Sequence, residues 1–291
     1  MKVEIICPLY NAENYLMDLH QSVLNQKTDD DFCISYVLTE SKDNTEKLLK
    51  DNNLNYHKVN KDEFSHSLTR ETMAKKSDAN IIVFITQDVK IEREDWLKNL
   101  VTPIKNKECD ASFSRQVTKY KGIEQYIREK NYPEQSYIHS KEDLQTMGMK
   151  AFFFSDASSA INAEVFKALN YYDGKKLVIN EDMYIAYKLI TSGYKIKYCA
   201  DSVVVHSHKF TLKELYNRYY DTGVFMAENS YLDKFGTTKT GGGLAKYVLK
   251  RALKEFNVKA LFRFIPDMMA RWLGMRNGKR FVNKNLKRGN K

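Results

Sequence analysis

The chain has 291 residues, of which 43% are hydrophobic and 29% charged, so we expect a globular protein with one large α/β core and an appendage. No apolar run approaches the roughly 20 residues that span a bilayer, and Pro8 interrupts the first apolar run before a secretory signal could form. The four cysteines are widely spaced, which argues against a zinc site or a disulfide framework and favours reduced, buried thiols.

Short apolar runs and amphipathic stretches alternate over the first two-thirds of the chain. The predicted strands are "VEIIC", "CISYVLT", "NYHKV" and "IIVFITQ", and the helices that follow them are predicted over residues 12–25, 43–51, 67–76 and 94–104. This alternation is typical of an open, mostly parallel sheet covered by helices. We therefore expect a Rossmann-like α/β fold.

A second ordered block is predicted between residues 151 and 201. It contains the strand-like "AFFFSDASSAIN", a helix from Ala163, a helix over residues 181–191 and the strand "YKIKYCA". The run "TTKTGGG" at residues 237–243 predicts a hinge. Residues 1–236 are accordingly predicted to form one domain with halves at about 1–110 and 111–236, followed by the hinge and a helical tail over residues 244–291.

The ends of the predicted strands carry the candidate chemistry, because ligands of open α/β sheets bind there. The first strand ends in "CPLYN", the second in "LTESKDNT" and the fourth in "TQD", and later elements end in "NED" and "HSH". No dinucleotide-binding glycine motif and no P-loop is present. A bound phosphate would need another counter-charge, such as a metal held by one carboxylate and by imidazoles from elsewhere.

Each of these signals has a structural alternative. Asp88 fits a turn or a helix cap, and His206 and His208 fit a solvated strand end, although their spacing on an extended segment points both rings the same way. Glu181 and Asp182 open a helix, where the macrodipole favours acids. Because adjacent acids point to different sides of a helix, only one of this pair can be aimed inward as a base.

Taken together and in this order, the segments resemble the family 2 inverting glycosyltransferases of the GT-A fold, most closely their bacterial rhamnosyltransferase branch, over about residues 2–230. "CPLYNAENYL" resembles the family's nucleotide-binding opening, "FSHSLTRE" its H-G-x-T-R segment, and "FITQD" the T-Q-D that replaces the usual D-x-D. The most specific stretch is residues 180–223, which resembles the family's E-D helix, G-Y-K-I strand, H-S-H segment and R-Y-x-D-T-G helix.

The resemblance implies a role for each matching residue. Asp182 would be the catalytic base, with Glu181 orienting the acceptor or capping the helix. Asp88 would hold a divalent metal, Mg²⁺ or Mn²⁺, together with one of His206 and His208, for which His206 is the better match. The nucleotide sugar would be bound by Pro8, Tyr10, Asn11, Glu40, Asp43, Arg70, Gln87 and Asp88. The acceptor side would be formed by Ser155, Asp156, Ser158 and Ser159.

Two departures from the family's pattern concern the donor. In "LTESKDNT" the acid that would contact the base is displaced, or replaced by Thr39 or Glu40. The T-Q-D variant also lacks the first acid of D-x-D, a loss compatible with a thymidine diphosphate sugar, whose deoxyribose offers one fewer hydroxyl. The resemblance implies transfer of rhamnose from dTDP-rhamnose to a lipid-linked saccharide in bacterial surface polysaccharide synthesis, such as a capsule or O-antigen.

The net charge of +10 is concentrated in the tail, since residues 241–291 hold 14 Lys and Arg against two acids. A basic helix that bears aromatic residues suits an anionic membrane, at about 1 kcal/mol per Lys or Arg, whereas packing on the body is the alternative. We expect a cytoplasmic protein at the inner face of the membrane, without a nucleic-acid partner. The competing functions are transfer from a UDP-hexose and non-catalytic binding of membrane or RNA. The oligomeric state is not predicted.

Overall fold

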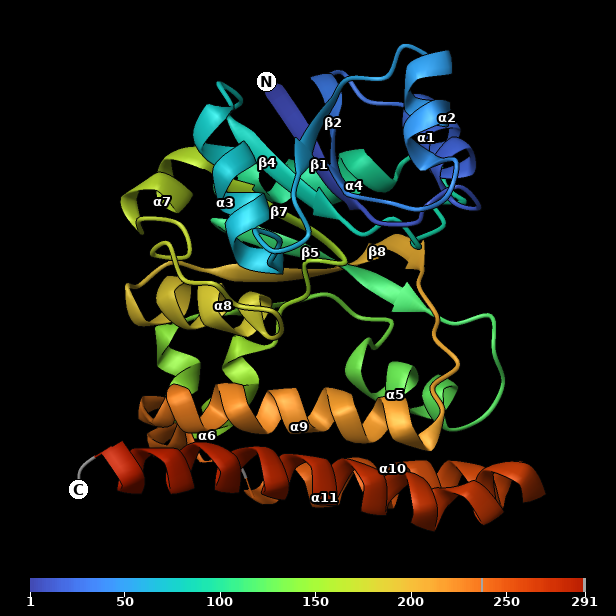
Figure 1. Cartoon of the computed structure of the whole chain (residues 1–291), viewed down its shortest axis with the longest axis vertical. Coiled ribbons are helices and arrows are strands. Elements are labelled where there is room, and N and C mark those ends of the chain that lie inside the picture. Colours follow the sequence, from blue (N-terminus) through green and yellow to red (C-terminus); the bar gives the residue numbers. More distant parts are fainter. Residues whose placement is uncertain (237, 290–291) are drawn as a thin grey trace. The chain divides into compact units, whose positions relative to one another are not determined.

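The computed structural model describes residues 1–236 and 238–289, with side chains over 1–236 and 242–285. The chain divides into two compact units (Figure 1). The first consists of residues 1–117, 132–143 and 151–206, and the second of residues 118–131, 144–150 and the chain from Ser207 onward. This division differs from the predicted boundary at residues 237–243, because the second unit also takes two segments from the interior of the chain.

The first unit is built on an eight-stranded sheet with the order β3-β2-β1-β4-β7-β5-β8-β6. Strands β3, β2, β1 and β4 run parallel, β7 is antiparallel to both β4 and β5, β5 and β8 run parallel, and β6 is antiparallel to β8. The strands are β1 (Lys2–Leu9), β2 (Asp31–Thr39), β3 (Tyr56–Val59), β4 (Ile81–Ile85), β5 (Ala111–Val117), β6 (Tyr137–His139), β7 (Ser158–Asn162) and β8 (Ile196–Val205). The predicted α/β class with a mostly parallel sheet is confirmed.

Helices cover both faces of this sheet. They are α1 (Leu16–Leu24), α2 (Thr45–Asp51), α3 (His66–Lys76), α4 (Trp96–Lys105), α7 (Ala163–Ala168) and α8 (Glu181–Thr191). Alternate residues of β1 and β4, among them Ile5 and Val83, pack in one core with α1, α2 and α4. On the opposite face, the ring of Phe84 lies 5.9 Å from that of Phe166 in α7 and 5.6 Å from the guanidinium of Arg70 in α3.

The first unit also holds the four cysteines. Cys7, Cys109 and Cys199 are buried as expected, whereas Cys33 is exposed. The difference arises at the start of β2, where the burial pattern alternates between exposed and half-buried positions before the strand becomes fully buried.

The second unit is helical, with α5 (Ile123–Asn131), α6 (Leu144–Met147), α9 (Leu212–Glu228), α10 (Thr238–Lys254) and α11 (Val258–Gly289) and a short 3₁₀ segment at Ser230–Phe235. Two further 3₁₀ segments lie along the chain on either side of α6. They are Lys141–Asp143, which belongs to the first unit, and Gly148–Phe152, whose last two residues belong to the first unit. Helices α9 and α11 run side by side (Figure 1). Their backbones approach closely at Gly278, where an added Cβ would lie 2.0 Å from the carbonyl oxygen of Tyr220. Among the described residues, no helix combines the length and the apolar character that crossing a membrane requires.

The region predicted as a hinge differs from the expectation. Residue 237 lies outside the described residues, and α10 begins at Thr238, so residues 238–243 belong to a helix. Three glycines lower the helix propensity by about 1 kcal/mol each without forbidding a helix. The packing of α10 on α5 through Val248, Ala252 and Tyr126 supplies the stabilisation that local propensity lacks.

Candidate active site

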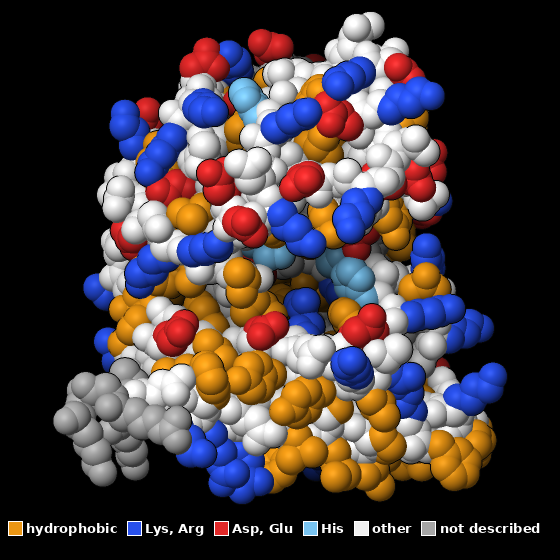
Figure 2. All heavy atoms as spheres, in the orientation of Figure 1, with side chains coloured by type: hydrophobic (Ala, Val, Ile, Leu, Met, Phe, Trp, Pro, Cys, Tyr) orange, Lys and Arg blue, Asp and Glu red, His pale blue; other side chains and the backbone are white. Residues whose placement is uncertain are grey.

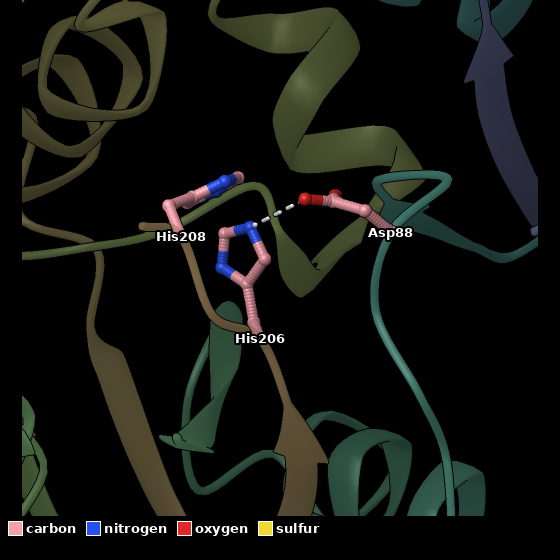
Figure 3. Close-up of side chains that lie close together, drawn as sticks. All are labelled: Asp88, His206 and His208. Atoms are coloured by element: carbon pink, nitrogen blue, oxygen red, sulfur yellow. Dashed lines mark ion pairs between the residues drawn. The ribbon is translucent and has the colours of Figure 1, made fainter. Parts of the chain in front are cut away.

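Asp88 and His206 meet where β4 and β8 end (Figure 3). The loop after β4 pairs with the last residue of β8, because Lys90 and Val205 exchange both backbone hydrogen bonds. This pairing places Nε2 of His206 3.4 Å from Oδ2 of Asp88. His208 follows two residues along the chain, and one ligand atom of each of the three residues lies within 4.8 Å of the others.

This donor set fits a divalent metal. A carboxylate oxygen and an imidazole nitrogen, each about 2.0 to 2.2 Å from one tetrahedral ion, lie about 3.3 to 3.6 Å apart. The 3.4 Å between Asp88 and His206 falls in this range. Asp88 and His206 are both largely buried, so the ligands are partly shielded from competing water. The structure thus brings Asp88 and His206 together, and their role as metal ligands stays a prediction.

The side chain of Gln116 holds His206 from the side opposite to Asp88. Its Oε1 lies 2.9 Å from Nδ1 of His206, and its Nε2 donates a hydrogen bond of 2.8 Å to the hydroxyl of Ser155. Gln116 is buried on β5 and comes beside β8 through the parallel pairing of these strands. Sequence reasoning missed Gln116, because the only signal was a polar residue at the end of the strand-like "CDASFSRQ".

The two acids that open α8 face different surroundings. Oε1 of Glu181 accepts a hydrogen bond of 2.6 Å from the guanidinium of Arg70, whereas Oδ1 of Asp182 accepts one of 2.7 Å from the backbone N–H of Met183. Asn180 precedes the helix with a left-handed φ of 57° and makes no side-chain capping bond. Glu181 is therefore turned toward Arg70, and Asp182 is the less buried of the two acids.

Arg70 belongs to a buried network. It is 1% exposed and also donates to the backbone oxygen of Asp156, whose carboxylate accepts hydrogen bonds from Ser159 and Tyr172. Burial lowers the pKa of Arg70, but the carboxylates of Glu181 and Asp156 raise it by more, so its pKa lies above the usual value. For Asp156, burial raises the pKa of the carboxyl group, although the charge of Arg70 opposes this shift.

These contacts differ from the predicted ligand contacts. Arg70, expected near the nucleotide, is enclosed and paired with Glu181. Asp156 and Ser159, expected on the acceptor side, are buried, and the hydroxyl of Ser158 contacts Ser114 and the indole N–H of Trp96 inside the core. Half-buried Ser155 is the exception among the predicted acceptor residues. A sequence motif does not show whether a residue is buried. Residues that support a site therefore cannot be distinguished in the sequence from residues that contact a ligand.

The loop after β1 is tied to the ends of β2 and β4. The side-chain amide of Gln87 accepts from the backbone N–H of Tyr10 at 2.7 Å and donates to its carbonyl oxygen at 2.9 Å. Asn11, with a left-handed φ of 48°, bridges to the second-strand loop by accepting from the N–H of Lys42. This bracing leaves the ring of Tyr10 exposed at the carboxyl end of β1, while Pro8 is half-buried within the strand.

Asp43 and Glu40 lie on the loop after β2. The carboxylate of Asp43 accepts hydrogen bonds from the backbone N–H of Glu13 and from the hydroxyl of Thr45. Burial acts to raise the pKa of Asp43, but these hydrogen bonds outweigh it and the pKa lies below its usual value. The side chain of Glu40 is exposed, and Thr39 carries a buried hydroxyl without a hydrogen-bond partner among the described residues.

Residues 4–169 match the family model described as Glycosyl transferase family 2, which is more than half of the chain. The chain belongs to this family. Two curated proteins are similar to this family 2 member over nearly its whole length. It is 32% identical to "O-antigen chain rhamnosyltransferase RfbN" of Salmonella typhimurium, covering 96% of this chain and 90% of the relative. It is 29% identical to "O-antigen chain rhamnosyltransferase WbaN" of Salmonella anatum, covering 94% and 88%. The resemblance to the rhamnosyltransferase branch is thereby confirmed.

Solved structures agree on the fold. The mannosyltransferase PcManGT of Pyrobaculum calidifontis, in complex with GDP-Man and Mn²⁺, matches with a TM-score of 0.62 and 15% identity, covering 98% of this chain and 86% of that one. Residues 1–349 of S. aureus TarS match with a TM-score of 0.58 and 15% identity, covering 99% and 92%. At this identity the likeness concerns the fold alone, and it confirms the expected GT-A type.

Proposed function

We propose that this family 2 member transfers rhamnose from dTDP-rhamnose to a saccharide acceptor in surface polysaccharide synthesis, with inversion at the anomeric carbon. The geometric observation that carries the proposal is the pairing of Asp88 with His206 at the carboxyl end of the sheet, which suits a nucleoside diphosphate held through a metal. The choice of rhamnose follows from the two relatives, both named as O-antigen chain rhamnosyltransferases and similar over nearly the whole chain.

In this proposal Asp182 is the base. Its carboxylate takes the proton of the acceptor hydroxyl while the oxygen attacks the anomeric carbon, and the nucleoside diphosphate leaves from the opposite face. Glu181 does not compete for this role, because Arg70 holds its carboxylate. The ion pair between these two side chains fixes the first turn of α8 and so keeps Asp182 in place.

A divalent metal bound by Asp88 and His206 would neutralise the charge that develops on the departing diphosphate. Mn²⁺ fits these residues better than Mg²⁺, because Mg²⁺ prefers oxygen ligands in a near-ideal octahedron whereas imidazole suits the transition metals. His208 is the candidate for a third protein ligand. Gln87, the middle residue of the T-Q-D segment, serves the site indirectly by bracing the backbone of Tyr10.

The second unit would provide attachment to an anionic membrane. Phe262, Ile265, Met269 and Trp272 are exposed at spacings of three and four residues along α11, and we call this set the α11 stripe. In Figure 2, hydrophobic side chains gather over the region of α10 and α11 with Lys and Arg beside them. The charge and the stripe suit a peripheral protein that meets a lipid-linked acceptor at the inner face of a cell membrane.

A donor screen tests the proposed function. Purified protein with Mn²⁺ is mixed with dTDP-rhamnose, UDP-glucose, UDP-GlcNAc or GDP-mannose, and the melting temperature is recorded. A ligand that binds only the folded state stabilises it by about 2.7 kcal/mol at 100 times its Kd. We expect the largest increase with dTDP-rhamnose, and a smaller one when the metal is chelated. A larger increase with a UDP-sugar would favour the alternative of a UDP-hexose donor, and no increase with any donor would contradict the proposal.

A further inference from the structure

Gln116 is positioned to control which nitrogen of His206 carries a proton. Gln116 is 2% exposed, and its side-chain amide lies between two partners, Nδ1 of His206 at 2.9 Å and the hydroxyl of Ser155 at 2.8 Å. With the amide nitrogen donating to Ser155, the amide oxygen faces the imidazole. An oxygen in this place accepts a hydrogen bond, so Nδ1 is the protonated nitrogen.

This arrangement has a consequence at the other nitrogen. When Nδ1 carries the proton, the lone pair of Nε2 points toward the carboxylate of Asp88, 3.4 Å away. A lone pair and a carboxylate repel each other unless a proton or a metal cation lies between them. Metal-binding histidines commonly donate their second N–H to a carbonyl or carboxylate oxygen, which fixes the ring and its tautomer.

We propose that Gln116 is a positioning residue of the metal site, which, anchored by Ser155, holds His206 in the Nδ1-protonated tautomer so that Nε2 is presented to a divalent cation beside Asp88. The inference rests on the proposed metal site. It assigns a role to a residue that touches neither the metal nor the substrate, and all four side chains belong to the first unit.

A merely structural role for Gln116 is the competing explanation. Gln116 is buried and satisfies the hydroxyl of Ser155, so its loss would lower stability in either case. The two explanations differ in metal affinity. A structural residue would change the melting temperature alone, whereas a positioning residue would change Mn²⁺ affinity, and only while His206 is present.

The test is a double-mutant cycle on the full chain, read out as the Kd of Mn²⁺ from the electron paramagnetic resonance signal of the free ion. We expect Gln116→Leu to weaken Mn²⁺ binding by about 10- to 100-fold. Gln116→Glu keeps an acceptor oxygen beside Nδ1, so it is expected to stay within about threefold of the unmodified protein. In a His206→Ala background, Gln116→Leu should cause no further loss.

The outcomes separate the inference from the metal site itself. If His206→Ala weakens binding and Gln116→Leu does not, the positioning role is wrong and the site stands. If His206→Ala also binds Mn²⁺ normally, both are wrong. An equal loss from Gln116→Leu with and without His206 would likewise overturn the positioning role.

A second measurement is made on the unmodified protein, and a variant is needed only to assign the signal. The tautomer of His206 is read from ¹H–¹⁵N correlation spectra of the unmodified protein with bound Cd²⁺ as a diamagnetic probe, and the signal is assigned by its loss in His206→Ala. A protonated Nδ1 supports the inference, and a protonated Nε2 overturns it.

Discussion

The guanidinium of Arg70 and the carboxylate of Glu181 form an ion pair of 2.6 Å in the interior of the first unit. Removing two charges from water costs a large desolvation free energy. The attraction within a buried ion pair offsets this cost only when further hydrogen bonds satisfy the remaining polar atoms. Here the backbone oxygen of Asp156 supplies one of them. Because Asp182 is adjacent to Glu181, the ion pair between Arg70 and Glu181 also determines the position of Asp182, the proposed base.

Breaking this pair on one side should be costly. Arg70→Met leaves the carboxylate of Glu181 buried without its partner, so we expect the free energy of unfolding to fall by about 3 to 5 kcal/mol. Urea denaturation measures the loss. The double variant Arg70→Met/Glu181→Leu should lose less than Arg70→Met alone, because the one nearby carboxylate that then lacks the guanidinium is that of Asp156, which keeps its hydrogen bonds from Ser159 and Tyr172. Arg93→Met breaks an ion pair with Asp95 in which both side chains are exposed and serves as the control, with little or no change expected.

Individual residues were predictable to different degrees. The association of Asp88 with one of the two histidines was implied by the family resemblance, and the structure brings Asp88 and His206 to 3.4 Å. Arg70 and Ser158 were expected to face ligands and are enclosed instead. Gln116 was not predicted at all, because its contact with His206 depends on the register between β5 and β8, which no local pattern encodes.

At the scale of elements, the second unit depends on the close approach of α9 and α11. An added Cβ would lie 2.0 Å from a backbone oxygen of α9 at Gly278 and 2.4 Å from another at Gly274. Real Cβ atoms do not approach backbone oxygens so closely, so the two helices would have to move apart. The small residues therefore set the distance between these helices.

Gly278→Ala should destabilise the protein although alanine is the better helix former. We expect a loss of about 1 to 3 kcal/mol, as for other overpacked sites, measured as a lower midpoint of thermal unfolding. Gly243→Ala is the matched control, since it lies in α10 with nothing within 4 Å of the added Cβ, and we expect it to stabilise the helix by up to about 1 kcal/mol. A neutral or stabilising Gly278→Ala would contradict the close packing of α9 and α11.

Elements with a strong period were predicted well from the sequence. The helix expected over residues 181–191 is α8 with the same bounds, and the alternation in the first hundred residues gives four parallel strands and four helices. The expected hinge is the clear difference, because α10 begins at Thr238. The low helix propensity of a glycine-rich segment predicts a linker. Here the packing of the rest of α10 on α5 determines that the segment is helical.

At the scale of the whole molecule, the basic charge and the exposed apolar side chains occur in the same part of the chain. Residues 241–291 carry a net charge of +12, and Phe262 and Trp272 of the α11 stripe are 81% and 59% exposed. Exposed aromatic side chains beside basic ones suit the interface of an anionic bilayer. The sequence predicted this tail, and the structure adds that α11 packs on α9 through one face and exposes the stripe on another.

Flotation with liposomes tests the membrane surface. We expect the protein to float with vesicles that contain anionic lipid, less so at high salt, and poorly with neutral vesicles. Phe262→Ser/Trp272→Ser should reduce the bound fraction severalfold, because each large side chain contributes about 1.5 to 3 kcal/mol when it is fully buried. Val178→Ser, an exposed site in the first unit, should float normally. Equal flotation of the double variant would contradict the assignment.

The measurement that tests the central claim most directly is transfer of labelled rhamnose from dTDP-rhamnose to a lipid-linked saccharide fraction, by the unmodified protein and by Asp182→Asn in the presence of Mn²⁺. The asparagine keeps the size of the side chain but cannot accept the proton. We predict metal-dependent transfer by the unmodified protein and a rate about 10²- to 10⁴-fold lower for the variant, with dTDP-rhamnose binding unchanged. Transfer by Asp182→Asn at the unmodified rate, or no transfer by the unmodified protein, would contradict the account.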